Sequence, residues 1–378
     1  MRSAHRIAAG IALIIPAFLL ACCSPATSTV QPSPAPTRSP VAHATIAPTA
    51  SPTITPTSSP PFWTEWEASA HAQADSPAFR YWDTSVPAQI PADCARCHST
   101  VGFLNFLGAD GSPAGLVDGS VEAGSLIDCE ACHNPAAEAL DSLTMPSGAE
   151  LSGLGSNTAC VLCHQGRTSG ADLKDLLKSL APKAISPGLA FVGVHYGPAG
   201  AVLFGSEAGG GYEYPSRAYA GRFQHALGYD TCTGCHDAHA LAVNAQACGA
   251  CHAGIESLAG VQSSLRVSTV DYDGDGDTAE GLAGEIETLQ TRLLAAITSN
   301  ADRFGFPIQY RADQDPFFFD PSGEPYRSWT PFLLQAAYNY QLARMDPGAY
   351  AHNPKYIMQL LYDSIQAIGG DHLGLVRP

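Results

Sequence analysis

The sequence predicts a mainly α and irregular fold that ends in a helical subdomain, and three observations lead to this prediction. The pentapeptide Cys-x-x-Cys-His occurs five times between residues 94 and 252. The segments between the copies are mostly short and rich in turn-forming residues, so they leave little room for a sheet. Beyond residue 280, apolar residues recur at the spacing of helices.

Each pentapeptide has the pattern of a covalent haem c attachment site. Two thiols three residues apart lie on about one helical turn, where they can reach the two vinyl groups of one haem, and the adjacent histidine meets the iron. A zinc site would need ligands in sets of four, with no fixed histidine after every cysteine pair. The sequence therefore predicts five haem c groups and a haem-cored fold. The cysteine pairs are Cys94/Cys97, Cys129/Cys132, Cys160/Cys163, Cys232/Cys235 and Cys248/Cys251, and the proximal histidines are His98, His133, His164, His236 and His252.

Residues 1–21 have the pattern of a lipoprotein-type signal peptide. Basic residues precede an apolar run from Ile7 to Leu20, which is too short for a transmembrane helix. The end of this run resembles a bacterial lipobox, which implies cleavage before Cys22 and a lipid on its thiol. Ordinary signal-peptidase cleavage nearby is the alternative. We expect an exported protein that faces the periplasm or the cell exterior and meets the membrane only through this lipid.

Residues 22–61 have the composition of a linker. Pro, Ser, Thr and Ala dominate and charge is almost absent, so the segment cannot bury a core and should form an extended stalk. Of the twelve cysteines, ten lie in the pentapeptides and the other two are Cys22 and Cys23. No cysteine is therefore left for a disulfide in the folded part.

The formal net charge of the chain is −16. An acidic chain is a poor partner for nucleic acid, because phosphates require a basic face. The charge favours a soluble exported protein or a cationic redox partner.

Residues 62–260 form the predicted pentahaem domain, in which every iron needs a second axial ligand. Six histidines remain outside the motifs, signal peptide and linker, and three methionines are the thioether alternatives. We expect bis-histidine ligation throughout, with His372 left out because it lies near the chain end. The proposed distal ligands are His71, His195, His225, His239 and His352.

Two stretches of this domain carry or surround those ligands. Residues 62–74, with His71, are expected to be helical. Residues 165–231 contain no attachment motif and should wrap back to supply ligands to haems bound elsewhere; within them, residues 209–215 read as a loop or hairpin. Bis-histidine haems are low-spin with no open position, so we expect low, negative potentials.

Residues 261–378 are predicted to form the C-terminal helical subdomain, with helices over residues 281–298, 331–345 and 354–368. Pro331 and Pro354 suit first-turn positions, and the glycines at 369–370 suit a helix end.

An acidic loop precedes the first of these helices and resembles the start of an EF-hand. Carboxylates at alternate positions can converge on one hard cation, but position twelve is Leu282, so Glu280 or Glu285 must supply the last ligand. A solvated Asp/Gly turn that caps the helix is the alternative. We expect a structural Ca²⁺ site with the ligands Asp271, Asp273, Asp275, Asp277 and Glu280.

Several stretches together carry a family resemblance: residues 94–103, 211–214, 223–225, 232–239, the acidic loop and residues 350–354. With these, the chain resembles bacterial exported multihaem c-type cytochromes. The resemblance implies electron transfer, with the five proposed distal histidines at positions expected for ligands, and it identifies neither donor nor acceptor.

The function favoured by these features is electron relay at or beyond the cell surface rather than catalysis. The expected partners are other cytochromes, a membrane oxidoreductase or extracellular acceptors. One alternative is a multihaem reductase with a five-coordinate haem, although no lysine variant of the motif is present. The other is a self-assembling subunit of an extracellular cytochrome filament.

Overall fold

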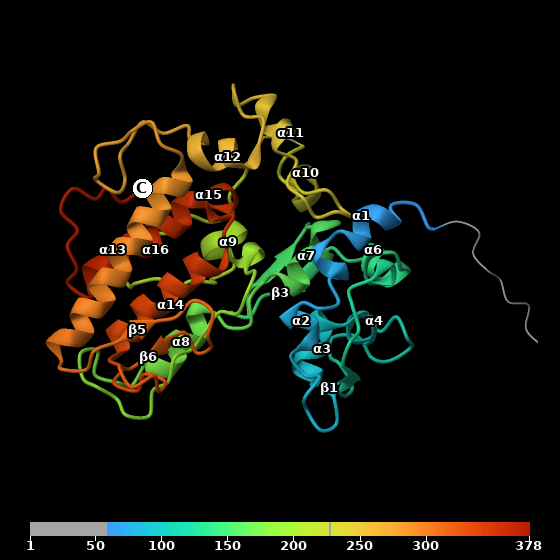
Figure 1. Cartoon of the computed structure of the whole chain (residues 1–378), viewed down its shortest axis with the longest axis horizontal. Coiled ribbons are helices and arrows are strands. Elements are labelled where there is room, and N and C mark those ends of the chain that lie inside the picture. The colour runs from blue at the N-terminus through green and yellow to red at the C-terminus, as the bar shows by residue number, and fades with distance from the viewer. Residues whose placement is uncertain (1–58, 227) are drawn as a thin grey trace, which may run out of the picture. The chain divides into compact units, whose positions relative to one another are not determined.

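Short helices joined by long irregular segments make up most of the folded chain, as the computed structural model shows (Figure 1). The structure describes residues 59–226 and 228–378. The predicted signal peptide, Cys22 and nearly all of the linker lie outside the described residues. The fold is mostly helical and irregular with few short strands, as the sequence predicts.

The elements before residue 265 are short, and most have four to eight residues. They are α1 (Trp63–Glu67), η1 (Ala70–Ala72), α2 (Pro77–Arg80), α3 (Ala92–His98), α4 (Thr100–Leu107), α5 (Cys129–Cys132), α6 (Pro135–Glu138), α7 (Asn157–Cys163), α8 (Gly170–Leu177), α9 (Ala199–Phe204), η2 (Gly205–Glu207), α10 (Cys232–Cys235), α11 (Ala245–Gly249) and α12 (Leu258–Ser264). The helical stretch predicted over residues 62–74 is broken. Ser69 takes an extended conformation that ends α1 and starts η1, where His71 lies.

The strands form three antiparallel pairs within the described residues and no larger sheet. The pairs are β1 (Gln89–Ile90) with β2 (Val121–Glu122), β3 (Ser142–Thr144) with β4 (Glu150–Ser152), and β5 (Gln309–Tyr310) with β6 (Phe318–Phe319).

Three longer helices pack against one another near the C-terminus: α13 (Leu282–Arg303), α14 (Pro331–Met345) and α16 (Pro354–Ala367), with the short α15 (Ala349–His352) between the last two. Thr330 caps α14 and Asn353 caps α16, each with proline at the first turn as predicted. The α13 helix runs five residues past its predicted end, because Ala301 is buried and Arg303 donates to the carbonyl of Ile368. In the described part of the chain, no helix is both long and apolar enough to cross a membrane.

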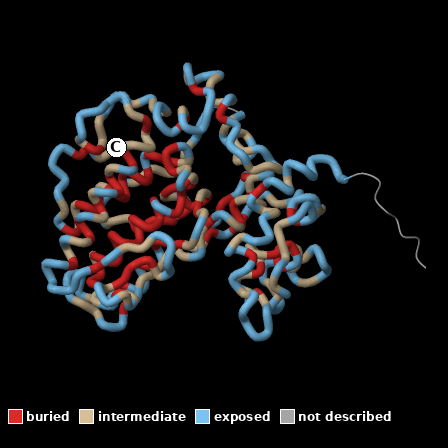
Figure 2. The backbone as a smooth tube through the Cα atoms, in the orientation of Figure 1, coloured by how far each residue is buried: buried red, intermediate tan, exposed pale blue. Residues whose placement is uncertain are grey.

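The buried residues fall into two clusters. The larger is centred on α13, α14 and α16 and extends to Leu173 and Val202 from earlier in the chain (Figure 2). The smaller gathers Phe103, Leu143, Val161 and other residues around α4, α7, α9 and the β3–β4 pair. The segments around the pentapeptides therefore have the smaller conventional core.

Residues 209–215 form a loop without strands that lies against α14 and α16. The side-chain amide of Asn339 pairs with both the N–H and the carbonyl of Tyr212, at 2.8 and 2.9 Å. A Cβ on Gly211 would meet the methyl groups of Leu360 and the hydroxyl of Tyr356, so a larger residue there would displace side chains of α16. This loop connects the long insertion to the C-terminal helices. The domain boundary predicted at residue 261 stays a prediction.

Candidate haem-binding sites

Each pentapeptide forms a hydrogen-bonded turn. In the last four copies the histidine N–H donates to the carbonyl of the first cysteine, at 2.8 to 3.0 Å. Asp128, Thr231 and Asn244 cap the starts of three of these turns with their side chains. In the first copy, the whole motif lies inside α3, which ends at His98. Because residues three and four apart share one face of a helix, both thiols and the imidazole lie on the same side of each turn.

The fifth copy carries its second cysteine just past the end of a helix. The α11 helix ends at Gly249, so Cys248 lies inside it and Cys251 lies beyond its end. The N–H groups of Cys251 and His252 both donate to the carbonyl of Cys248, at 3.1 and 2.8 Å, so the chain still makes about one turn across the motif.

The ten motif thiols also differ in how far the protein covers them. Cys251 is exposed, as are Cys129 and Cys132, whereas the other seven are partly buried. Haem attachment at these three cysteines, as at the other seven, stays a prediction.

Each motif histidine faces one histidine from outside the motifs. The distances between ring centroids are 5.9 Å for His98–His195, 6.1 Å for His133–His239, 6.4 Å for His164–His71, 6.4 Å for His236–His352 and 6.2 Å for His252–His225. The ten histidines are the five predicted proximal and the five predicted distal residues. His372, which is not among the predicted ligands, lies beside Tyr362 instead.

The width of these gaps fits one metal ion between two rings. A metal–imidazole nitrogen bond is about 2 Å long and the nitrogen lies about 1 Å from the ring centre, so two rings on opposite sides of one ion have centres about 6 Å apart. Two rings stacked face to face in direct contact would lie much closer, as do Phe62 and His239, whose centroids are 4.4 Å apart. None of the ten rings belongs to the buried core. Each site therefore offers two thiols for covalent attachment and two imidazoles for the iron, which are the groups that hold a bis-histidine haem c.

Backbone carbonyls fix the orientation of three motif rings. Nδ1 of His98 donates to the carbonyl of Ala78 at 2.8 Å. His164 and His236 donate in the same way to Gly197 and Leu241, both at 3.1 Å. A carbonyl can only accept, so Nδ1 carries the proton and Nε2 is left as the free lone pair. A metal ligand usually has such a partner on its second nitrogen.

The environment of several rings keeps them neutral. Burial and the nearby His164 lower the pKa of His71 to about 4. Burial also lowers the pKa of His98 and of His195. Only a neutral imidazole has a lone pair for a metal, so these rings are in the form that can ligate iron at neutral pH.

The helices that carry the motifs touch one another. The α7 helix contacts both α3 and α10. The thiol of Cys97 donates to the carbonyl of Leu162, and the thiol of Cys163 donates to the carbonyl of Arg96, both at 3.8 Å. The Asn157 side chain also accepts from the backbone of Cys232 at 2.8 Å. The third attachment motif therefore lies directly between the first and the fourth.

Comparison with known proteins gives one consistent result. The chain is 27% identical over 368 residues to the C-type polyheme cytochrome OmcB of Geobacter sulfurreducens, which covers 78% of this chain and 46% of OmcB. It is 28% identical over 375 residues to OmcC of the same organism, covering 78% of this chain and 45% of OmcC. This homology supports a place in the multihaem c-type cytochrome family. The chain spans about half the length of these relatives. Neither a protein-family model nor a solved structure matches it.

One residue that matters to these sites has no signal in the sequence. Asp346 is 3% exposed and accepts from Nδ1 of His352 with both oxygens, at 2.9 and 2.8 Å. Burial alone would lower the pKa of His352, but the Asp346 charge outweighs it and the pKa is raised. Asp346 follows the end of α14, so neither helical periodicity nor motif spacing marks it.

The loop of residues 194–197 serves two of the histidine pairs at once. His195, which faces His98, has a φ of 79°, a conformation that non-glycine residues seldom adopt. Two residues later, the carbonyl of Gly197 accepts from His164. Gly197 itself has a φ of 61°, and a Cβ there would lie 3.1 Å from Nδ1 of His164.

The predicted calcium ligands are brought together only in part. Asp271 and Asp273 lie close to Glu285, and Asp273 and Asp275 lie close to Glu280. Asp277 belongs to neither group.

Replacing Gly197 with alanine is expected to disturb the His164 ring as well as the backbone. The positive φ costs about 1 kcal/mol for alanine, and the added methyl group presses on the ring. Gly111→Ala is the matched control, because Gly111 has a φ of 92° with nothing within 4 Å of a new Cβ. Thermal unfolding and the visible spectrum of the haem-loaded protein measure both effects. Equal losses of stability and unchanged spectra in the two variants would contradict a role for Gly197 at His164.

Proposed function

We propose that this chain is an electron-transfer protein with five covalently bound, bis-histidine haems. The observation that carries the proposal is the set of five histidine pairs, each of which joins one motif histidine to one non-motif histidine. The homology to polyheme cytochromes supports electron transfer of the multihaem kind. Haem supplies the one-electron chemistry, through exchange between the ferric and ferrous states of its iron.

The chain's own residues would divide this work by type. The ten motif cysteines form the thioether bonds, and the five motif histidines bind iron on the proximal side. His195, His239, His71, His352 and His225 bind on the distal side, opposite His98, His133, His164, His236 and His252 respectively. The contacts of α7 with α3 and α10 support a contiguous array, which a relay of electrons requires.

The same pairing favours a carrier over the two alternatives. A reductase needs one iron with an open position, whereas every motif histidine faces a second histidine. A filament in which one subunit completes the haems of the next needs a ligand from another copy, whereas all five pairs lie within one chain. Redox proteins or extracellular electron acceptors remain the proposed partners.

The test of this proposal is the state of the haems in the purified protein. We expect five haems per chain by the pyridine haemochrome assay, low-spin signals only in EPR, and no change of the reduced spectrum with CO. A midpoint titration is expected to give low, negative values. A high-spin signal from one fifth of the haem, with CO binding, would overturn the carrier in favour of a reductase.

Replacing His239 with alanine is expected to open one site. His133 then loses the ring that faces it, so about one haem in five becomes high-spin and binds CO. His372→Ala is the control, since His372 faces no motif histidine and all haems should stay low-spin. Optical titration with CO counts the open sites, and an unchanged spectrum of the His239 variant would remove His239 from the ligand set.

Replacing Asp346 with asparagine is expected to raise the midpoint potential of one haem. The carboxylate on Nδ1 makes His352 a more basic ligand, which favours ferric iron, and asparagine keeps the acceptor but removes the charge. The shift should be on the order of 60 mV, the one-electron equivalent of a tenfold change in an equilibrium constant. Spectroelectrochemical titration measures it against Asp302→Asn, an exposed position on α13. A curve that superimposes on the unmodified protein would contradict the role of Asp346.

We also propose that a lipid on Cys22 anchors the exported protein to a membrane, as the lipobox-like sequence suggests. Replacing Cys22 with alanine is expected to abolish palmitate labelling and to move the protein from the membrane to the soluble fraction. Cys23→Ala, one residue away, should retain both. Labelling that survives in the Cys22 variant would show that the anchor lies elsewhere.

A further inference from the structure

The acidic loop before α13 concentrates negative charge. Residues 271–280 contain five acidic side chains and no basic one. Four of these side chains, together with Glu285, form two groups that share Asp273, and Asp277 belongs to neither. The two groups differ in how their oxygens are satisfied, and only one of them needs a further partner.

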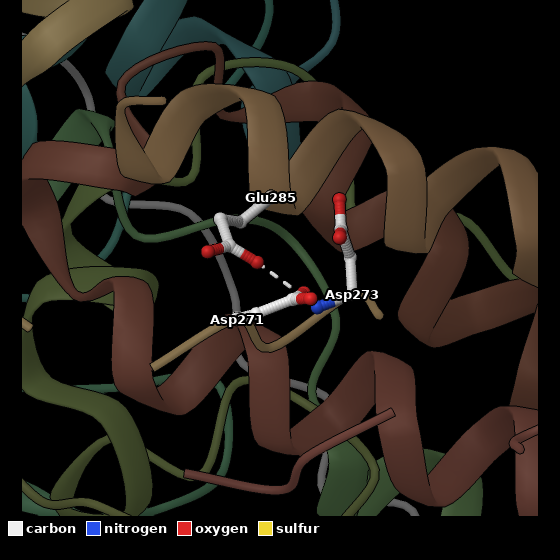
Figure 3. Close-up of side chains that lie close together, drawn as sticks. All are labelled: Asp271, Asp273 and Glu285. Atoms are coloured by element: carbon white, nitrogen blue, oxygen red, sulfur yellow. Dashed lines mark hydrogen bonds between the residues drawn. The ribbon is translucent and has the colours of Figure 1, made fainter. Parts of the chain in front are cut away.

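The group of Asp271, Asp273 and Glu285 is held together by the protein itself (Figure 3). The buried Glu285 accepts from the backbone N–H groups of Tyr272 and Asp273, at 2.8 and 2.9 Å, and from Arg266 at 2.8 Å. Asp271 accepts from the backbone N–H groups of Gly274 and Gly276. Every carboxylate oxygen of Glu285 and Asp271 is therefore hydrogen-bonded, and no cation is required to explain their positions.

The group of Asp273, Asp275 and Glu280 is satisfied only in part: one oxygen of Asp273 and one of Asp275 accept from backbone N–H groups, at 3.1 and 2.7 Å. Asp273 is 0% exposed, and its Oδ2 has no hydrogen-bond partner among the described residues. Oε1 of Glu280 is also buried without a partner in the described structure. Each residue contributes an oxygen to a set whose members all lie within 4.8 Å of one another.

The neighbouring protein groups do not balance this charge. Arg266 is held by Glu285 and by the carbonyls of Ser268, Val270 and Glu280. Burial and the surrounding carboxylates raise the pKa of Glu280 to about 7. Burial also raises the pKa of Asp273, and the nearby Thr288 hydroxyl lowers it only in part, without a hydrogen bond to Oδ2. A buried carboxylate is costly unless it is paired or coordinates a metal.

We propose that Asp273, Asp275 and Glu280 bind one Ca²⁺ ion. Three clustered carboxylates on an acidic loop suit a hard cation that takes six to eight oxygen ligands, the remainder coming from backbone carbonyls and water. This set is narrower than the one the EF-hand resemblance suggests. Asp271 is used by the backbone, and Asp277 accepts from the N–H groups of Ala279 and Glu280 to shape the turn.

Gly284 makes room for the third ligand. A Cβ at this position would lie 1.8 Å from Oε2 of Glu280, so glycine lets the carboxylate lie over the first turn of α13. The positive end of the helix dipole there favours a carboxylate. The loop also touches the C-terminal tail, since Tyr272 accepts from the N–H of Val376 at 2.9 Å and a Cβ on Gly274 would meet the backbone of Gly374. Ca²⁺ binding should therefore stabilise the start of α13 and the tail together.

The test uses the full haem-loaded chain after dialysis against a chelator, which leaves covalently attached haem in place. Calorimetric titration with CaCl₂ should give one ion per chain, and thermal unfolding should move upward by several degrees. Glu280→Gln lies at the edge of the site and should fold, with at least tenfold weaker binding and little thermal shift. Asp273→Asn should lose binding altogether. Asp320→Asn is the control, because Asp320 accepts from backbone N–H groups in a separate Asp/Gly turn and should behave like the unmodified protein.

Three outcomes would overturn the proposal: no Ca²⁺ uptake, unchanged binding in Glu280→Gln, or equal stabilisation by Mg²⁺ at the same concentration. Haem content and spin state, recorded on the same samples, report on electron transfer separately. A failure of the calcium site therefore leaves the haem assignment standing, and the converse also holds.

Discussion

The gap between two facing imidazole rings is the constraint on which the rest of this structure depends. If each pair binds one haem iron as proposed, the two iron–nitrogen bonds set the width of the gap. A gap wider by one ångström would break one of these bonds. Five such gaps have to be formed by one chain. Some of the partners are far apart in the sequence, as are His71 and His164, or His236 and His352. Each pair therefore acts as a long-range restraint on loops that have little regular structure of their own.

The distribution of the buried core reflects this restraint. Helices α13, α14 and α16 are stabilised in the ordinary way, by burial of leucine, isoleucine and aromatic side chains. The shorter elements around the pentapeptides bury less and rely on local hydrogen bonds, such as those of the motif histidines to nearby carbonyls. Haem attached at these turns would add the apolar surface that the side chains there do not provide. The α15 helix joins the two regions, because His352 follows directly from packed helices and faces a motif histidine.

The local features of the fold could be predicted from the sequence because they depend on neighbouring residues. The α14 helix begins and ends where its capping threonine, first-turn proline and apolar periodicity place it. The pentapeptide turns follow from the spacing of their own residues, and in four of them the histidine N–H donates to the carbonyl of the first cysteine. The assignment of distal to proximal histidines could not be predicted, since nothing local to His195 indicates His98.

Asp346 and the acidic loop show a second limit. Asp346 lies only six residues from His352, and Asp271 accepts from backbone N–H groups three and five residues away. These contacts are local, but they depend on the conformation of irregular turns, which neither a motif nor helical periodicity marks.

The five histidine pairs are alike in geometry but not in their hydrogen-bonded surroundings. His98, His164 and His236 donate to neutral carbonyls, whereas His352 donates to a buried carboxylate. A carboxylate partner makes an imidazole a stronger electron donor than a carbonyl partner does. These four histidines belong to three pairs, and the pair of His236 and His352 should favour ferric iron most among the three. Haems with the same two axial ligands would then differ in redox potential, because the hydrogen-bond partners of those ligands differ. A gradient of potential along neighbouring haems is what gives electron flow a direction.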